Sequence, residues 1–118
     1  MNKILVVDDD LDILTLVKIA LSINNFSVEA ISRWEDIPDK IRSFKPDLVL
    51  LDVSLGGADG RNICKDLKHT DDTRHLPVVL FSANAEMGNY LEDCKANDFI
   101  AKPFELSHLV KTLRQHLN

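Results

Sequence analysis

Three apolar runs of the sequence end in charged side chains that together could hold a metal ion and an anion. The runs cover residues 4–7, 48–51 and 99–101, and the charged residues that follow them are Asp8 with Asp9, Asp52, and Lys102. Buried strands that stop in charges place those charges at one edge of a sheet. Several carboxylates and one ammonium gathered there are typical of a site that holds a phosphoryl group.

Asp8, Asp9 and Asp52 would repel one another if their carboxylates lay within a few ångströms. At an effective dielectric constant of about 20, each pair separated by ~4 Å costs roughly 4 kcal/mol. We therefore expect a bound cation, and Mg²⁺ (or Mn²⁺) fits because carboxylates, water and phosphate are its usual ligands. Asp10 and Asp12 are interpreted differently, as residues that only favour the N-terminus of the next helix.

Lys102 precedes Pro103, and the proline permits a cis peptide bond that would fix the turn. In an acidic pocket the lysine ammonium could pair with a carboxylate at rest and with phosphoryl oxygens later. Ser82 follows another apolar run, residues 77–81, and its hydroxyl could donate to the same phosphoryl group. By itself Ser82 would be interpreted as a turn residue, so its proposed role depends on its companions.

Apolar runs alternate with helical patterns along the whole chain, which predicts an α/β fold. Strands are expected at residues 3–7, 26–30 (an edge strand), 47–51, 77–81 and 98–101. Helices are expected at residues 10–23, from about 36 onward, 59–68, 87–94 and 105–117. This alternation predicts a doubly wound five-stranded parallel sheet with right-handed crossovers and helices on both faces. Ligands of such sheets bind beyond the carboxyl ends of the strands.

The second helix carries conflicting signals. Ser32 and Glu35 resemble a capping box, whereas Pro38 would remove a backbone donor from a helix that ran through it. We expect this helix to begin late, near Asp36, or to be kinked.

Composition indicates a globular chain and excludes several functions. The 118 residues, 45% of them hydrophobic and 28% charged, predict one domain over residues 1–118. The net charge of −5 argues against direct binding of nucleic acid, which needs a basic face. No apolar stretch predicts a membrane span or a signal-peptide core. Cys64 and Cys94 lack metal-site spacing and are interpreted as reduced, mostly buried thiols, so we expect a cytoplasmic location.

Other residues that could take part in chemistry, the loop glycines and the histidines, are not assigned to the site. Gly56, Gly57 and Gly60 match no phosphate-loop pattern, so they are expected to give the backbone flexibility around the site. The four histidines are interpreted as solvated surface residues; they are His69, His75, His108 and His116.

Five segments of the chain together resemble the receiver domain of two-component response regulators. Each is weak alone, but five in order at compatible spacing are specific and cover nearly the whole chain. They are residues 4–9 (ILVVDD), 45–52 (KPDLVLLD), 59–60 (DG), 76–83 (LPVVLFSA) and 102–104 (KPF). The resemblance implies a flavodoxin-like sheet with strand order 2-1-3-4-5.

The resemblance also implies roles for the candidate residues. Asp52 matches the phosphoacceptor, and Lys102 and Ser82 match the residues that contact the phosphoryl group. Phe99 matches the switch aromatic that turns inward when the hydroxyl residue moves. The expected function is a signalling domain, not an enzyme, although such domains promote their own phosphorylation and dephosphorylation.

The same resemblance implies a metal site and two tuning positions. Asp8 and Asp9 match the acidic pair at the Mg²⁺ site, to which Asp52 and the backbone carbonyl of Ser54 would also contribute. Ser54 and Asn84 match the positions that influence dephosphorylation.

The implied partners are a histidine kinase or a histidine phosphotransfer protein, which would supply the phosphoryl group from a phosphohistidine. A downstream protein or an appended output domain would read the surface formed by the fourth helix, fifth strand and fifth helix, and the resemblance allows a phosphorylation-dependent dimer. On the first helix, Leu16, Ile19 and Ile23 extend the apolar band. They are interpreted either as a wide buried stripe or as a docking patch for a histidine-bearing helical bundle.

Some residues depart from the family pattern. Gly56 stands where many members have proline, and Lys95 stands where glycine usually precedes the Ala-Asp pair. The stretch from Ser82 to Lys102 is a little shorter than usual, which affects the fourth helix but not the acidic site.

Two other functions are compatible with parts of the sequence. The run Asp8-Asp9-Asp10 superficially resembles the nucleophile loop of aspartate-dependent phosphohydrolases, which usually need more chain for a cap. The chain could also be a binding module of the same fold that is never phosphorylated.

Overall fold

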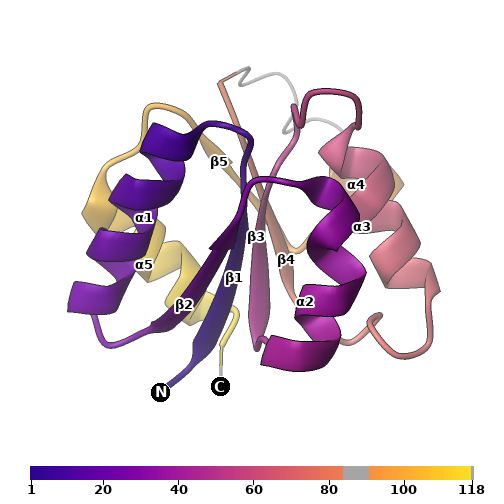
Figure 1. Cartoon of the computed structure of the whole chain (residues 1–118), viewed down its shortest axis with the longest axis horizontal. Coiled ribbons are helices and arrows are strands. Elements are labelled where there is room, and N and C mark those ends of the chain that lie inside the picture. The colour runs from indigo at the N-terminus through magenta and orange to yellow at the C-terminus, as the bar shows by residue number, and fades with distance from the viewer. Residues whose placement is uncertain (84–90, 118) are drawn as a thin grey trace.

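The computed structural model describes residues 1–83 and 91–117, and these form a five-stranded parallel sheet flanked by helices (Figure 1). The strand order is β2-β1-β3-β4-β5. The strands are β1 Lys3–Val7, β2 Ser27–Ile31, β3 Leu48–Asp52, β4 Val78–Ser82 and β5 Asp98–Ala101. The predicted fold class and the strand order implied by the resemblance are both confirmed.

Helices cover both faces of the sheet. They are α1 Leu11–Ile23, the 3₁₀ turn η1 Trp34–Asp36, α2 Ile37–Phe44, α3 Gly60–His69, α4 Leu91–Cys94 and α5 Leu106–Gln115. Figure 1 shows α1 and α5 on one face and α2, α3 and α4 on the other. Of the fourth helix expected at residues 87–94, the part before residue 91 lies outside the described residues.

The central strands are buried on both faces, as their continuous apolar runs predict. In β1, Ile4 and Val6 pack in the core under α1 and α5, whereas Leu5 and Val7 pack in the core on the opposite face. The edge strand β2 is half-buried throughout. Side-chain alternation in β1 therefore anchors helices on both sides and holds the carboxyl end of the strand rigidly.

Three strands, β2, β3 and β4, end one residue later than the ranges expected from the apolar runs. β3 ends at Asp52 and β4 ends at Ser82, so these two polar residues belong to the hydrogen-bonded sheet itself. Their backbone positions are therefore fixed by pairing with neighbouring strands, in which Asp52 lies opposite Phe81 and Ser82 lies opposite Ala101.

The observed starts of the first two helices agree only partly with the sequence prediction. Asp10 caps α1, because its Oδ1 accepts hydrogen bonds from the backbone N–H groups of Asp12 (3.0 Å) and Ile13 (3.3 Å). α2 begins late, at Ile37 with Pro38 in its first turn, where the missing N–H has no helical partner to lose. The expected capping box is wrong, because the residue before η1 is Arg33 and no side chain caps it.

A left-handed residue precedes the fifth strand. Lys95 has a φ of 61°, a conformation that glycine adopts at lowest cost. Lys95, which stands where members of the expected family usually carry glycine, therefore has the left-handed backbone conformation that glycine favours.

Candidate functional site

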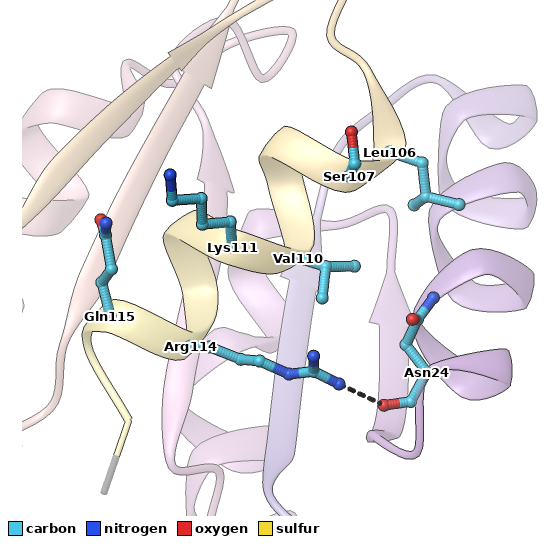
Figure 2. Close-up of a pocket in the computed structure, with 7 residues that line it drawn as sticks. All are labelled: Asn24, Leu106, Ser107, Val110, Lys111, Arg114 and Gln115. Atoms are coloured by element: carbon cyan, nitrogen blue, oxygen red, sulfur yellow. Dashed lines mark hydrogen bonds between the residues drawn. The ribbon is translucent and has the colours of Figure 1, made fainter.

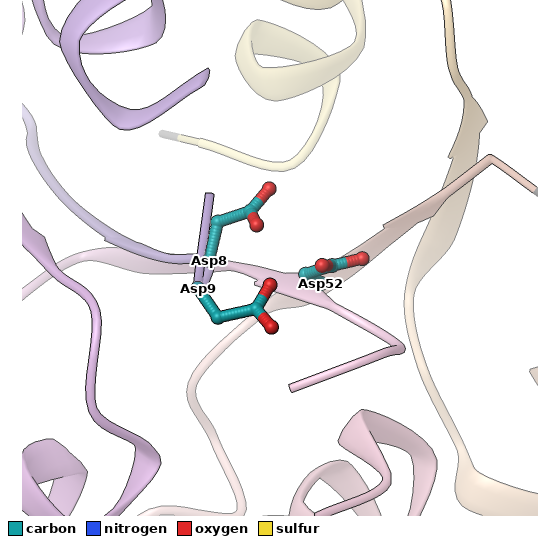
Figure 3. A group of neighbouring side chains, drawn as sticks. All are labelled: Asp8, Asp9 and Asp52. Carbon is teal, nitrogen blue, oxygen red and sulfur yellow. The ribbon is translucent and has the colours of Figure 1, made fainter. Parts of the chain in front are cut away.

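Three carboxylates meet at the carboxyl edge of the sheet. Asp8 and Asp9 directly follow β1 and Asp52 ends β3, and each offers an oxygen that lies within 4.8 Å of the others (Figure 3). Asp8 is fully buried and Asp52 is 4% exposed, while Asp9 faces solvent. The expected gathering of these three side chains is therefore confirmed, and their hard oxygen donors could hold a metal ion.

Lys102 brings a positive charge to the same place from the end of β5. Its Nζ lies 2.8 Å from Oδ2 of Asp8 and 3.5 Å from Oδ1 of Asp52. The ammonium also lies 4.4 Å from the centre of the Phe81 ring. The peptide bond between Lys102 and Pro103 is cis, as the sequence allowed.

Asp8 is buried but well supplied with donors. One carboxylate oxygen accepts a hydrogen bond from the backbone N–H of Asp10 at 2.9 Å, and the other accepts from Lys102. Its own backbone N–H donates to the carbonyl of Ile31 in β2. A buried carboxylate needs such partners, so this network fixes Asp8 beside Asp52.

Asp52 is the group whose protonation the site perturbs most clearly. Burial and, to a smaller extent, the negative charge of Asp8 together raise the pKa of Asp52 from 3.8 to about 6. Lys102 and a hydrogen bond from the backbone N–H of Ser54 act in the opposite direction. One ammonium therefore does not fully offset the carboxylates, and a second cation would favour the ionised Asp52.

The loop between β3 and α3 packs tightly against the acidic residues. The backbone N–H of Gly60 donates to the carbonyl of Val53 at 2.7 Å. A Cβ at Gly60 would lie 2.1 Å from the backbone oxygen of Asp52, so only glycine fits there. Gly56 has a φ of 49°, and a Cβ on it would lie 3.2 Å from Oδ2 of Asp9.

These glycines are where the sequence interpretation fell short. Flexibility was expected of Gly60, whereas the structure shows a steric requirement next to Asp52. The available signal was its place at the start of α3, directly after the loop that leaves Asp52. Ser54 lies in this loop, where it forms an isolated bridge with Asp59.

Ser82 and Phe99 occupy adjacent strands. Ser82 is buried at the end of β4, and its backbone carbonyl accepts a hydrogen bond from the N–H of Lys102 at 2.8 Å. Phe99 in β5 lies opposite Leu80 in β4. Its side chain is partly buried and packs against the core on the face covered by α2, α3 and α4. Asn84 lies outside the described residues.

The outer face of α1 is apolar and open to solvent. Leu16, Ile19 and Ile23 are 64%, 56% and 75% exposed, respectively. The interpretation of these three residues as part of a wide buried stripe is therefore wrong. They form an unburied stripe of large aliphatic side chains on one helix, a feature that marks many interaction surfaces.

One histidine is less solvated than the sequence suggested. The Nε2 atom of His116 lies 2.9 Å from Oδ2 of Asp98, and its side chain is 23% exposed. The contact joins the end of α5 to the start of β5, at the edge of the sheet opposite the carboxylates.

The larger hollows lie away from the acidic site. One of about 660 Å³ lies between α5 and the end of α1, where Arg114 donates to the backbone carbonyl of Asn24 (Figure 2). Another, of about 620 Å³, lies between α2 and α3 and has Ile37, Ile41 and Ile63 in its lining. Neither is lined by the three carboxylates.

None of the helices among the described residues is both long and apolar enough to span a membrane.

Comparison with known proteins gives a consistent result. The family model of the response regulator receiver domain matches residues 4–114. The response regulator MprA of Mycolicibacterium vanbaalenii is 35% identical over 114 residues, which cover 95% of this chain and 48% of MprA. The chain thus spans about half the length of the curated relatives it matches.

Solved structures agree with this assignment. The receiver domain of Klebsiella pneumoniae RstA, solved in its BeF₃-activated form, superposes with a TM-score of 0.88 at 33% identity, with 99% of each chain covered. NtrX from Brucella abortus superposes with a TM-score of 0.88 at 31% identity, over 99% of this chain and 27% of NtrX.

Proposed function

The chain belongs to the response regulator receiver domain family, and on this basis we propose that it accepts a phosphoryl group on the carboxylate of Asp52. The donor is a phosphohistidine of a histidine kinase or of a histidine phosphotransfer protein. The observation that carries the proposal is the position of Asp52, which is buried at the end of β3 beside Asp8 and Lys102. In this proposal residues 1–118 act as one cytoplasmic receiver domain.

The carboxylate set fits a hard divalent cation. Asp8, Asp9 and Asp52 offer three oxygens close together, and burial beside Asp8 raises the pKa of Asp52, so added positive charge would stabilise the ionised site. We assign the site to Mg²⁺ (or Mn²⁺), held by these residues and by the backbone carbonyl of Ser54. When bound, the ion supplies positive charge that offsets the carboxylates and the phosphoryl oxygens.

Asp52 and its neighbours have different roles in phosphoryl transfer. A carboxylate oxygen of Asp52 attacks the phosphorus in line, an acyl phosphate bond forms, and the bond to the histidine nitrogen breaks. Lys102 pairs with the transferred phosphoryl oxygens. Its Nζ already lies 3.5 Å from Asp52, so it needs little rearrangement to do so. Ser82 donates its hydroxyl to another phosphoryl oxygen.

The added charge, about −2 in total on the phosphoryl group, provides a signal. Recruitment of Ser82 leaves room beside β4 for Phe99 to turn inward, which biases the surface made by α4, β5 and α5 between two states. A downstream protein, an appended output domain or a second copy reads that surface. Water later hydrolyses the acyl phosphate, at a rate that Ser54 and Asn84 tune.

The exposed stripe of α1 supports a protein partner. Leu16, Ile19 and Ile23 offer apolar area on a helix that begins just after Asp8 and Asp9. A helical bundle that presents a histidine to Asp52 could cover this stripe. The net charge of −5 argues against direct binding of nucleic acid by these residues.

Phosphorylation of the purified chain tests the proposal. The chain is incubated with Mg²⁺ and either acetyl phosphate or a ³²P-labelled histidine phosphotransfer protein, beside the variants Asp52→Asn and Asp12→Asn. We expect Mg²⁺-dependent label that hydroxylamine removes, present in Asp12→Asn and absent from Asp52→Asn. The Asp12 carboxylate is an exposed control at the start of α1.

Other results would favour the alternative functions. Steady phosphatase turnover that survives Asp52→Asn and is lost in Asp8→Asn would indicate a phosphohydrolase. Absence of Mg²⁺-dependent label from every donor would indicate a binding module that is never phosphorylated.

A further inference from the structure

The two cysteines of the chain meet between α3 and α4, although 30 residues separate them. Cys64 lies in the middle of α3, and Cys94 is the last residue of α4. The Sγ atom of Cys64 lies 3.4 Å from the backbone oxygen of Cys94. Figure 1 shows the two helices side by side on the same face of the sheet.

The two cysteine side chains are also electrostatic neighbours. Burial raises the pKa of the Cys64 thiol to about 12, and the neighbouring Cys94 thiol contributes through its charge and a side-chain hydrogen bond. Both cysteines are reduced and buried, with exposures of 0% for Cys64 and 3% for Cys94. The Cys64 sulfur thus lies against the backbone of Cys94 on the adjacent helix, and a disulfide requires two cysteines that are close neighbours in this way.

Solvent approaches the pair from one side. Cys94 contributes to the lining of a small polar hollow of about 150 Å³, together with Asn62, Lys65 and Asp93. These three neighbours are exposed, whereas Cys64 lies fully buried beneath Cys94. A small oxidant therefore meets Cys94 first, and Cys64 is the second thiol.

We propose that Cys64 and Cys94 form a reversible intramolecular disulfide that ties α3 to α4 under oxidation by peroxide. The Cys94 sulfur attacks one peroxide oxygen, the O–O bond breaks, and a sulfenic acid and water form. The Cys64 sulfur then attacks the sulfenic sulfur, the S–S bond forms, and a second water leaves. Two thiols and one peroxide give one disulfide and two waters, and a dithiol reductant reverses the change.

The disulfide would constrain α4. It closes a covalent loop between positions 64 and 94 that contains β4. A loop of this size raises the unfolding temperature by roughly 5–15 °C when the native geometry accepts the bond. If α4 belongs to the signalling surface, which rests on the proposed function, oxidation would also hold that surface in its resting state.

Intact-mass measurement of the whole chain tests the disulfide directly. Reduced protein is treated with hydrogen peroxide under native conditions, and free thiols are then counted with a maleimide. We expect a loss of about 2 Da, no free thiol, no covalent dimer, and full reversal by dithiothreitol. A persistent pair of thiols, a gain of about 16 or 32 Da without the loss, or a covalent dimer would overturn the proposal.

Single-cysteine variants test the order of events. We expect Cys64→Ser to retain Cys94 as a sulfenic acid that dimedone traps, and Cys94→Ser to react many-fold more slowly. Equal reaction of both variants would overturn the assignment of Cys94 as the first thiol. If serine impairs folding, Cys64→Ala and Cys94→Ala replace these variants.

The same measurement separates this proposal from phosphorylation. Asp52→Asn cannot accept a phosphoryl group on Asp52 but keeps both cysteines, so it should still lose about 2 Da. The effect on signalling is tested by comparing amide spectra of oxidised and reduced protein upon addition of beryllium fluoride. Smaller shifts in α4, β5 and α5 are expected after oxidation, and equal shifts would overturn the constraint on the surface but leave the disulfide result intact.

Discussion

The Nζ atom of Lys102 lies 2.8 Å from Oδ2 of Asp8, a carboxylate with no solvent exposure, although 94 residues separate the two in sequence. The same ammonium lies 3.5 Å from Asp52. One cation is thus shared by two buried carboxylates, with the exposed Asp9 nearby. Burial, together with the negative charge of Asp8, raises the pKa of Asp52, and the shortage of positive charge beside these carboxylates lets the site bind a further cation.

Replacement of Lys102 should destabilise the protein, because the buried carboxylates would lose their positively charged partner. Lys102→Met would leave Asp8 without its charged partner, and we expect the free energy of unfolding in metal-free buffer at pH 7 to fall by about 2–4 kcal/mol. Urea unfolding measures this change. Lys111→Met, at an exposed position of α5, is the control and should change stability by less than about 0.5 kcal/mol. Equal losses in both variants would contradict the prediction.

Stability should depend on pH through Asp52. Because its pKa is raised from 3.8 to about 6, the folded protein binds this proton more tightly than the unfolded chain does. The resulting stabilisation is complete below pH ~4 and is lost as the pH rises through ~6. Asp52→Asn should therefore be more stable than the native chain at pH 7, by up to about 3 kcal/mol in metal-free buffer.

Urea unfolding at several pH values from about 4 to 8 tests this prediction. The difference between Asp52→Asn and the native chain should shrink toward zero at the acidic end. A difference that does not vary with pH would show that the pKa of Asp52 is not shifted by folding. Asp12→Asn provides the matched control for loss of one carboxylate.

Mg²⁺ should stabilise the fold through Asp9. At about 100 times its dissociation constant, the ion should raise the free energy of unfolding by about 2.7 kcal/mol. Asp9→Asn should leave metal-free stability within about 0.5 kcal/mol of the native value, because Asp9 is exposed. The stabilisation by Mg²⁺ should be much smaller in this variant and unchanged in Asp12→Asn, as thermal unfolding with increasing MgCl₂ would measure. Equal stabilisation of all three proteins would remove Asp9 from the metal site.

Gly60 should tolerate no side chain. In Gly60→Ala the new Cβ would lie 2.1 Å from the backbone oxygen of Asp52, so α3 or the end of β3 must shift. We expect a destabilisation of about 2–4 kcal/mol by urea unfolding and slower phosphorylation by acetyl phosphate. Asn62→Ala, at an exposed position of the same helix, should change neither measurement appreciably. A free energy of unfolding of Gly60→Ala equal to that of the native chain would contradict the steric requirement for glycine at this position.

A charge on the outer face of α1 should affect the partner and not the chemistry. Leu16→Glu is expected to slow phosphoryl transfer from a phosphorylated phosphotransfer protein at least tenfold, because a carboxylate would be desolvated in the contact. Phosphorylation by acetyl phosphate and urea stability should be nearly unchanged. Ser22→Glu adds the same charge at another exposed position of α1. Transfer rates that are equal for Leu16→Glu and the native chain would exclude the stripe from docking.

Local signals in the sequence predicted some elements better than others. Apolar runs located the strands to within one residue, because both faces of the central strands are buried. The late start of α2 followed from Pro38. The capping box failed because the chain enters η1 at Arg33 with no side-chain cap, and a pattern of two residues does not fix that backbone path.

Contacts between distant segments could not be predicted in the same way. His116 was expected in solvent but lies beside Asp98, since α5 ends next to the start of β5. The stripe on α1 was open to two interpretations, and only the position of the helix on the sheet showed that Leu16 is exposed. Cys64 and Cys94 had no pairing signal at all.

The amino-acid sequence alone was enough to predict that charged residues end the buried strands, because apolar runs and their boundaries are local properties of the chain. It thereby placed Asp8, Asp9, Asp52 and Lys102 at one edge of a parallel sheet. Only the folded chain shows which carboxylate is fully buried, which one Lys102 contacts most closely, and that Cys64 lies against Cys94. These properties depend on strand order and on the packing of helices against the sheet, and both arise from contacts between residues far apart in the sequence.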